Sequence, residues 1–282
     1  MMRLLGLRFP AALWRQRELW RQLSQREVQG RYRGSMLGWG WSLITPLMTL
    51  AVYTFVFSQV FQARWGDLQQ SGPLVFAINL FAGLIVFNLF SETASQAPGL
   101  MLGNVNLVTK VIFPLEILPA VTVAVALFHA LTSLVVLVGF QLLNDLLSAP
   151  VDGLASLPIP VTLLWLPLVW LPMISGCLAL SWLLSALGVY LRDLGQVIGV
   201  VVNLLMFLSA VFYPLSALPP QWQPLLKLNP MVLVIEQTRR VAVNGQPPSL
   251  NYLAWGALLG LLACELAFRS FQKARRGFAD VL

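Results

Sequence analysis

The sequence predicts an all-α, polytopic membrane protein with six transmembrane helices, and three observations lead to this fold class. The chain is 58% hydrophobic but only 10% charged, whereas a soluble domain carries about 25% charged residues. Its mean hydropathy is +0.77. Six long stretches without a charged residue also run along its 282 residues, and a membrane-spanning helix needs only about 20 apolar residues.

Each charge-free stretch, trimmed of its polar and proline-rich ends, gives one predicted helix. The stretches are continuously apolar and lack the alternation of a barrel strand. Inside a bilayer the backbone must satisfy its own hydrogen bonds, so helices are the remaining choice. The six predicted helices cover residues 39–61, 74–91, 117–142, 162–188, 196–213 and 251–268.

The basic residues predict how these helices are oriented. With both termini in the cytoplasm, cytoplasmic segments contain 14 of the 18 lysines and arginines, and outer segments contain four. This bias follows the positive-inside rule, so both termini are expected to be cytoplasmic. The net charge of +7 does not indicate a nucleic-acid partner, because orientation and contact with membrane lipids explain basic residues in so apolar a chain.

The segment before the first span is predicted to be an amphipathic helix that lies in the membrane interface. On a helical wheel of residues 12–33, apolar side chains gather within about a third of the circumference. They are Ala12, Leu13, Leu19, Trp20 and Leu23, whereas Trp14, Val28 and Tyr32 interrupt the opposite side.

Arginines and glutamines fill most of the remaining wheel, as in helices that meet lipid headgroups. The residues expected to bind an anionic headgroup are Arg26, Arg31, Tyr32 and Arg33. Alternatively, the arginines only enforce topology. Gly30 and Gly34 would allow a sharp turn from the membrane plane into the first span.

Two connections are not simple loops. Residues 92–116 form a polar segment containing glycine and asparagine, for which one or two short helices at the cytoplasmic surface are predicted. In residues 213–248, prolines between 214 and 230 exclude one continuous span. Two short helices at about 221–227 and 230–243 are expected to enter the outer leaflet and return, which is tolerated where protein or water satisfies the backbone.

Several motifs along the chain resemble one known family. The stretch RELWRQLSQREVQGRYRGSMLGWGWSLITPLMTLAVYTFVFSQVF resembles the N-terminus of the permease subunit of ABC-2-type polysaccharide exporters. These exporters move lipid-linked O-antigen, capsular polysaccharide or teichoic acid across the bacterial cytoplasmic membrane. The resemblance continues in NVNLVTKVIFPLEILP, LGVYLRDLGQV, FYPLSALP, LNPM and FQKARRGFADVL, and so covers nearly the whole chain in order. It leaves open which polysaccharide is carried.

The resemblance implies six transmembrane helices, an interfacial N-terminal helix, a cytoplasmic coupling helix between the second and third spans, and two re-entrant outer helices. It also implies a homodimer in the inner membrane, bound to two separate ATP-binding subunits, with a polyprenyl-linked polysaccharide as substrate. Periplasmic and outer-membrane export proteins are further candidate partners. The sequence has no G-x-x-x-x-G-K-[ST] phosphate loop. ATP and Mg²⁺ would therefore bind the partner, and this chain is expected to be a non-enzymatic transport subunit without a cofactor or metal.

The predicted organisation has three parts. Residues 1–34 are the cytoplasmic N-terminus with its interfacial helix, 35–270 are the six-helix transmembrane domain, and 271–282 are a cytoplasmic tail. The coupling region is placed at 92–113 and the re-entrant region at 214–245.

Two cytoplasmic turns supply candidate contacts with the ATPase, as the resemblance implies. They are Asn104, Asn106 and Lys110 in the coupling region, and Arg192 and Asp193 between the fourth and fifth spans. Alternatively, the coupling region is an ordinary interfacial helix. Arg192 and Asp193 could equally be a water-facing pair that contributes less than about 1 kcal/mol.

Aromatic side chains near the outer side are candidates to line a polysaccharide conduit, because sugar C–H faces pack on rings while the hydroxyls stay hydrated. The residues chosen are Tyr53, Phe57, Phe212 and Tyr213, beside Phe55 and Phe207. Aromatics in membrane helices also pack or form interface belts, so this alternative stays open. The two tyrosines are favoured because a hydroxyl that faces lipid would lack a partner.

Ionisable residues at membrane depth are usually paired or face water. Glu236, Arg239 and Arg240 lie in the second re-entrant helix, where a Glu236–Arg240 pair at i,i+4 is expected to stabilise an outer gate. A solvated surface is the alternative. His129, with no carboxylate expected nearby in its span, is predicted to form an interhelical hydrogen bond rather than to couple protons, and the same bond is predicted for Asn79, Asn88 and Asn203.

Two other functions stay open on the sequence. One is an ABC-2 exporter of drugs or lipids, and the other is a membrane scaffold of glycan assembly that transports nothing. An intramembrane enzyme is not indicated, because the sequence shows no metal cluster, catalytic dyad or paired intramembrane carboxylates.

Overall fold

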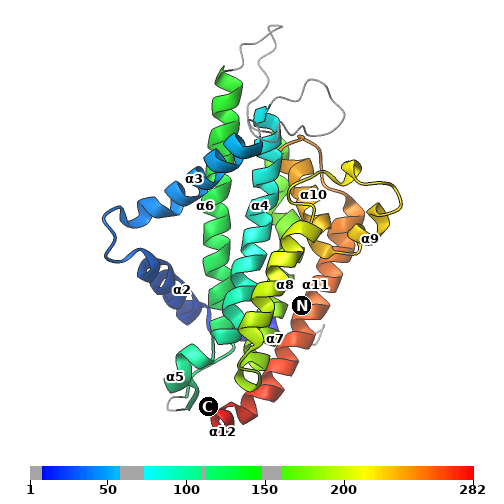
Figure 1. The fold of residues 1–282 in the computed structure, drawn as a ribbon. Coiled ribbons are helices and arrows are strands. Elements are labelled where there is room, and N and C mark those ends of the chain that lie inside the picture. The colour runs from blue at the N-terminus through cyan, green and yellow to red at the C-terminus, as the bar shows by residue number, and fades with distance from the viewer. Residues whose placement is uncertain (1–7, 58–72, 110–111, 148–159) are drawn as a thin grey trace.

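The computed structural model describes residues 8–57, 73–109, 112–147 and 160–282, and it shows an all-helical chain with long helices side by side (Figure 1). The longest are α4 (Pro73–Gln96), α6 (Ile117–Leu147), α7 (Leu166–Tyr190) and α11 (Leu250–Ala274). Within the described residues, four helical segments are long and apolar enough to cross a membrane: Val75–Gly99, Ile117–Leu143, Val161–Tyr190 and Leu250–Val281. The chain is a multi-pass membrane protein.

The two remaining predicted spans are shorter apolar helices. They are α3 (Trp41–Phe55) and α8 (Leu194–Leu208), each of 15 residues. At 1.5 Å per residue, 15 residues extend about 22 Å, less than the roughly 30 Å hydrocarbon core. For α3 the predicted C-terminal end lies outside the described residues. For α8 the predicted end at residue 213 is wrong, because Ala210 adopts a left-handed conformation with φ 52° and ends the helix.

The other helices begin near the predicted positions but end later. α4 reaches Gln96 rather than residue 91, and α11 reaches Ala274 rather than residue 268. The predictions stopped at Glu92 and near Arg269 because a charge was taken to mark the membrane edge. A helix needs no such boundary, since its backbone hydrogen bonds continue unchanged as it passes into water.

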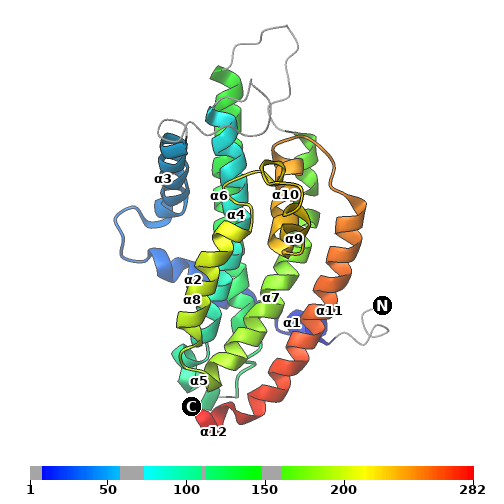
Figure 2. The same ribbon diagram turned by 45° about the vertical axis from the view of Figure 1, so that its right-hand side comes forward.

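The N-terminal segment forms two helices instead of one. α1 (Phe9–Arg15) and α2 (Arg17–Tyr32) meet at Gln16, which leaves the helical conformation with φ −110° and ψ 17°. After α2 the chain turns sharply at Gly34, whose φ of +84° favours glycine. Gly30, in contrast, lies inside α2. Figure 2 shows the turn between α2 and α3, and η1 (Gly38–Gly40) leads directly into α3.

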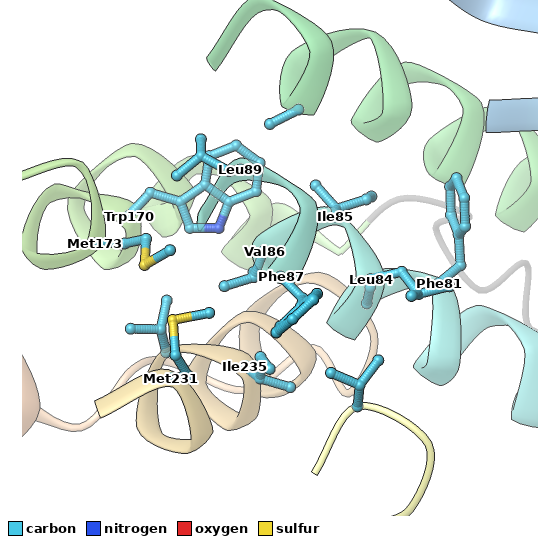
Figure 3. Close-up of a cluster of buried hydrophobic side chains, with 14 of the residues drawn as sticks. Phe81, Leu84, Ile85, Val86, Phe87, Leu89, Trp170, Met173, Met231 and Ile235 are labelled. Atoms are coloured by element: carbon cyan, nitrogen blue, oxygen red, sulfur yellow. The ribbon is translucent and has the colours of Figure 1, made fainter. Parts of the chain in front are cut away.

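One core joins α4, α7 and α10 (Pro230–Ala242). Figure 3 shows its centre, where apolar side chains of α4 contact Trp170 and Met173 of α7 and Met231 and Ile235 of α10. The Trp170 indole donates a hydrogen bond to the Thr238 hydroxyl at 3.1 Å. α10 is therefore held against two long helices and does not form an independent loop.

The connection between α8 and α11 agrees with the prediction of two short helices. α9 (Gln223–Lys227) and α10 match the expected ranges, and the Asn229 side chain caps α10 by accepting from the Met231 amide at 3.0 Å. A proline at the first position of α10 completes this start signal. Figure 1 shows α9 and α10 in the upper half, and α5 (Val105–Thr109) and α12 (Phe278–Val281) at the lower end.

A second core, at the lower end in Figure 1, joins α1, α7, α11 and α12. Trp182 of α7 is fully buried between Phe9 and Phe268, and its indole donates to the Glu116 carbonyl at 3.0 Å. The predicted C-terminal tail is part of this core, because Phe278 is buried there and follows η7 (Arg275–Gly277). Arg275 adds an ion pair with Glu116 at 2.8 Å.

Candidate functional site

A polar cavity of about 460 Å³ lies between α3, α4 and α6. Such a lining is unusual between apolar helices, because polar groups at membrane depth need partners. The hydroxyl side chains of the lining are Tyr32, Ser42, Thr45, Thr49, Ser91, Ser95, Thr132 and Ser133, and its amides are Asn88 and Gln96.

Several hydroxyl groups of this cavity donate their protons to backbone carbonyls, and their oxygens can still accept hydrogen bonds. Thr49 donates to the Thr45 carbonyl of its own helix at 2.9 Å, and Thr132 and Ser133 both donate to the His129 carbonyl, at 2.9 and 2.8 Å. Such local bonds satisfy the hydroxyl proton. Each oxygen keeps the capacity to accept from a ligand or water, so the cavity offers acceptors for a hydroxyl-rich molecule.

An ionic cluster stands at one end of the cavity and joins three helices. Glu92 of α4 accepts from Arg31 of α2 at 2.5 Å and contacts His129 Nδ1 of α6 at 2.9 Å. His129 Nε2 also lies 3.1 Å from the Tyr32 hydroxyl. The side chain of Glu92 is only 18% exposed, and burial raises the pKa of Tyr32, which keeps its hydroxyl protonated. We call Arg31, Tyr32, Glu92 and His129 the ionic cluster.

The prediction for His129 was right about an interhelical hydrogen bond but wrong about the absence of a carboxylate. The sequence places Glu92 at the start of the connection 92–116, outside the second predicted span, whereas α4 continues past it and presents it to α6. One signal was present in the sequence. Ile85, Asn88, Glu92 and Gln96 recur at helical spacing and all line the cavity. Within the described ranges, no three histidine, cysteine, aspartate or glutamate side chains gather as metal ligands would.

The apolar face of α2 packs on protein. Val28 is buried against Ile117, Val121 and Val125 of α6, with Leu19, Leu23 and Tyr32 beside it. The sequence places Val28 and Tyr32 on the opposite, polar side of the wheel, and this part of the prediction is wrong, because Val28 is buried against α6 with Tyr32 beside it.

Trp20 is also tied to α6, because its indole donates to the Ala120 carbonyl at 3.0 Å. Of the predicted headgroup residues, Arg31 and Tyr32 belong to the ionic cluster. Arg26 and Arg33 are exposed and form no ion pair with any residue that the structure describes. Of the three predicted headgroup arginines, Arg26 and Arg33 are therefore exposed, and Arg31 contacts α4.

Three of the four predicted conduit aromatics come together near the end of α3. The Phe57 ring lies 6.1 Å from Tyr53 and 5.9 Å from Phe212, measured between centroids. Phe207 joins through Phe212 at 5.6 Å. Tyr213 contributes differently, because its hydroxyl donates to the Phe207 carbonyl at 2.8 Å and so already has a partner inside its own turn.

The predicted outer-gate pair of Glu236 with Arg240 is wrong, because Glu236 has a different partner. Glu236 pairs with Arg239 at i,i+3, 3.1 Å apart, and Arg240 instead donates to the Pro247 carbonyl at 2.7 Å. The Arg239 side chain is only 3% exposed, so the solvated alternative does not hold for it. Its guanidinium donates to the carbonyls of Asn79, Ala210 and Val211 at 2.7 to 3.0 Å.

The interhelical bonds predicted for three asparagines are not found among the described residues. The Asn79 amide donates within its own helix, to the Val75 carbonyl at 2.9 Å. Asn88 and Asn203 are exposed, and neither side chain has a hydrogen bond within the described part of the chain. Asn88 instead faces the polar cavity.

The coupling region forms short helices, as predicted: η3 (Ala97–Gly99), η4 (Leu102–Asn104) and α5. Asn104 donates to the Leu100 carbonyl at 2.9 Å, whereas Asn106 is exposed. Lys110 lies outside the described residues. Arg192 and Asp193 are exposed in the turn between α7 and α8, and neither forms an ion pair with a described residue.

Gly188 controls how closely the coupling region approaches α7. A methyl group there would overlap the Pro98 carbonyl group and lie 2.8 Å from its carbon. We expect Gly188→Ala to lower the free energy of unfolding by about 1–3 kcal/mol through overpacking, and to speed hydrogen exchange across residues 97–109. Gly176→Ala is the matched control in the same helix, since nothing lies within 4 Å of the added methyl. Equal effects of the two variants would contradict the close contact.

Comparisons with known proteins agree along the whole chain. The sequence profile described as ABC-2 type transporter matches residues 18–242. The chain is 30% identical over 280 residues to the O-antigen export system permease protein RfbA of Myxococcus xanthus, covering 97% of this chain and 99% of that protein. It is also 22% identical to the protein of the same name from Klebsiella pneumoniae, over 92% of this chain and 93% of that protein.

A capsule-related protein is similar as well. The polysialic acid transport protein KpsM of Escherichia coli is 24% identical over 254 residues, which cover 88% of this chain and 92% of that protein. The profile match covers most of the chain, including α2, the cavity, the coupling region and α10. This chain therefore belongs to the ABC-2 type transporter family.

Proposed function

We propose that this chain is the membrane-spanning permease subunit of an ATP-driven exporter of lipid-linked polysaccharide, of the O-antigen or capsular class, in the bacterial inner membrane. The observation that carries the proposal is the cavity between α3, α4 and α6, whose lining includes many hydroxyl and amide side chains together with the ionic-cluster residues Tyr32, Glu92 and His129. A glycan needs exchangeable hydrogen-bond partners along its path, and hydroxyl side chains supply them. The names of the similar proteins favour the same substrate class.

The cations of α2 would receive the pyrophosphate of the lipid carrier. Arg26 and Arg33 are exposed, and Arg31 is the cation already bound to Glu92. Phosphate forms bidentate, charge-assisted hydrogen bonds with guanidinium groups, so it would compete with Glu92 for Arg31. Binding of the headgroup would then loosen α2 from α4 beside the cavity.

A second copy of the chain would complete the conduit. α8 exposes an apolar face that includes Val200, Leu204 and Phe207, and a homodimer would place such faces together. The aromatic cluster around Phe57 would line the outer part of the path. The coupling region and the Arg192–Asp193 turn would contact two ATP-binding subunits, with six spans and both termini in the cytoplasm.

The decisive experiment locates the glycan when this chain is missing. The gene is deleted in its own host, and surface glycan is probed on intact and on lysed cells. The deletion strain is complemented with the wild-type chain or with the double variant Arg31→Ala/Arg33→Ala. We expect glycan to disappear from the surface and to accumulate inside on its lipid carrier, with rescue by the wild-type chain only.

The other outcomes decide against the proposal in different ways. Glycan missing both outside and inside would indicate a scaffold of glycan assembly. Normal surface glycan, in a host without a second copy, would exclude polysaccharide export and leave a drug or lipid exporter. Full rescue by the double variant would exclude the headgroup role of these arginines.

A further inference from the structure

A basic pocket of about 220 Å³ lies where the start of α1 meets the C-terminal part of α11. It is separate from the polar cavity and shares no lining residue with it. Four cations line it, together with the ring of Phe268 and the amide of Gln272; the cations are Arg8, Arg269, Lys273 and Arg276.

One buried carboxylate beside the pocket holds two of its lining residues in place. Glu265 of α11 accepts from the backbone amides of Arg8 and Phe9, at 2.7 and 3.3 Å, and from Arg269 at 2.6 Å. It therefore anchors α1 to α11 and fixes the position of Arg8. Glu265 offsets one of the four cations, so the pocket retains an excess of positive charge.

An apolar stripe leads along α11 directly to this pocket. Trp255, Leu259, Leu262 and Leu266 follow one another at spacings of three and four residues, and each is at least 50% exposed. The same spacing continues through the cations Arg269, Lys273 and Arg276. One exposed face thus changes from apolar to basic between Leu266 and Arg269.

The length of the stripe matches one leaflet of a bilayer. From Trp255 to Leu266 the helix rises about 17 Å at 1.5 Å per residue, and half of a 30 Å hydrocarbon core is about 15 Å. A diacyl lipid whose phosphate met the cations would lie with its chains along the stripe. Basic pockets beside membrane helices on the cytoplasmic side bind anionic headgroups in this way.

We propose that the pocket at the α1–α11 junction binds an anionic phospholipid of the cytoplasmic leaflet, with its phosphate among Arg8, Lys273 and Arg276 and its acyl chains on the exposed stripe of α11. The lipid joins α1 to the last turns of α11, next to the core that contains the coupling region. This site is independent of the substrate path, so its failure would leave the proposed function intact.

Native mass spectrometry of the purified full-length chain, after delipidation, tests the site. Phosphatidylglycerol and phosphatidylethanolamine are added at equal concentration, and the bound fraction of each is measured. We expect one site per chain with a clear preference for phosphatidylglycerol. Each cation near an anionic lipid contributes about fivefold in affinity, so Lys273→Gln/Arg276→Gln should weaken phosphatidylglycerol binding about 25-fold.

The matched control changes the same charge elsewhere. Arg15→Gln/Arg21→Gln removes two exposed arginines that do not line the pocket, and it should bind phosphatidylglycerol as the wild type does. If the first double variant does not fold, Lys273→Gln should weaken binding about fivefold, while Lys273→Arg should retain it.

Three results would overturn the proposal. Equal binding of the two lipids would show that the pocket does not recognise anionic headgroups. Equal loss in both double variants would assign the preference to overall charge. Displacement of phosphatidylglycerol by inorganic phosphate at equal concentration would indicate a phosphate site that makes no use of the apolar stripe.

Discussion

Replacing Arg239 with methionine is expected to lower the free energy of unfolding by about 3–5 kcal/mol, because the change removes a guanidinium that donates to three buried carbonyls. Methionine keeps much of the side-chain length but has no donor. The carbonyls of Asn79, Ala210 and Val211 would then lose the guanidinium that now serves all three. A buried carbonyl without a donor costs about 1–3 kcal/mol.

The neighbouring arginine provides the control. Arg240 is exposed and donates to one carbonyl, that of Pro247, so Arg240→Met should change the free energy of unfolding by less than about 1 kcal/mol. Titration with sodium dodecyl sulfate in mixed micelles would measure both variants. Similar losses in the two would refute the role of Arg239 as the link between α4, α10 and the turn after α8.

Ala210 offers a sharper test of the same link. Its left-handed φ of 52° costs a residue with a side chain about 1–2 kcal/mol, and the Arg239 hydrogen bond stabilises that conformation. Ala210→Gly removes the strain, so it should recover about 1 kcal/mol of what Arg239→Met loses. Equal gains from Ala210→Gly in the wild-type chain and in the Arg239→Met chain would mean that Arg239 does not hold this turn.

Arg239 also explains why α4 carries a glycine at position 83. A methyl group there would lie 2.7 Å from the Arg239 Nη2 atom, too close for a non-bonded contact. The guanidinium therefore passes beside the backbone of α4 on its way to the Asn79 carbonyl. No local pattern indicates this approach, because the glycine and the arginine are far apart along the chain.

The features that could be predicted from the sequence are those that local patterns determine. Long apolar stretches predicted α4, α6, α7 and α11, since a bilayer excludes any unpaired backbone. The prolines before residue 231 predicted the short helices α9 and α10 within about two residues. Gly34 predicted the turn after α2, because a positive φ is tolerated by glycine.

The features that could not be predicted depend on pairs of residues on different helices. Glu92 of α4 pairs with His129 of α6. Glu116, just before α6, pairs with Arg275, just after α11. In the sequence alone, Glu92 and Glu116 each mark the end of a charge-free stretch and so indicate a membrane boundary. The i,i+4 rule also predicted Arg240 as the partner of Glu236. In the structure Arg239 is buried in the core, and this i,i+3 neighbour forms the ion pair with Glu236.

The aromatic cluster could be predicted from the sequence only in part. The resemblance and the chemistry of sugars selected Tyr53, Phe57 and Phe212, and the three rings do meet. Their meeting follows from the way α3 ends beside the turn after α8. Whether a ring also faces a conduit depends on a second copy of the chain, which lies beyond the reach of a local pattern.

Given the proposed function, Glu92→Gln is expected to reduce export about two- to tenfold, which corresponds to about 0.5–1.4 kcal/mol for groups in direct contact. The change keeps the shape of the side chain but removes the charge that now pairs with both Arg31 and His129. The last turn of α2 would lose its tie to α4, so amide hydrogens of residues 28–33 should exchange faster. Surface glycan at equal chain abundance and hydrogen exchange measure the two effects.

A double-mutant cycle decides whether Arg31 and Glu92 act together. If the two residues act only through their ion pair, Arg31→Gln and Glu92→Gln should each reduce export. The double variant should then export as much glycan as the more impaired single variant. Groups in direct contact show coupling of about 0.5–3 kcal/mol, and the partial exposure of this pair favours the lower half of that range because water screens it.

Glu27→Gln is the matched control, since Glu27 is an exposed carboxylate of α2 without an ion pair among the described residues. It should leave export and exchange unchanged. Strictly additive losses for Arg31 and Glu92 would mean that the two act separately, with Arg31 on the lipid headgroup and Glu92 on the cavity. Unchanged exchange in α2 after Glu92→Gln would show that packing of Val28 on α6, and not the ionic cluster, holds the helix in place.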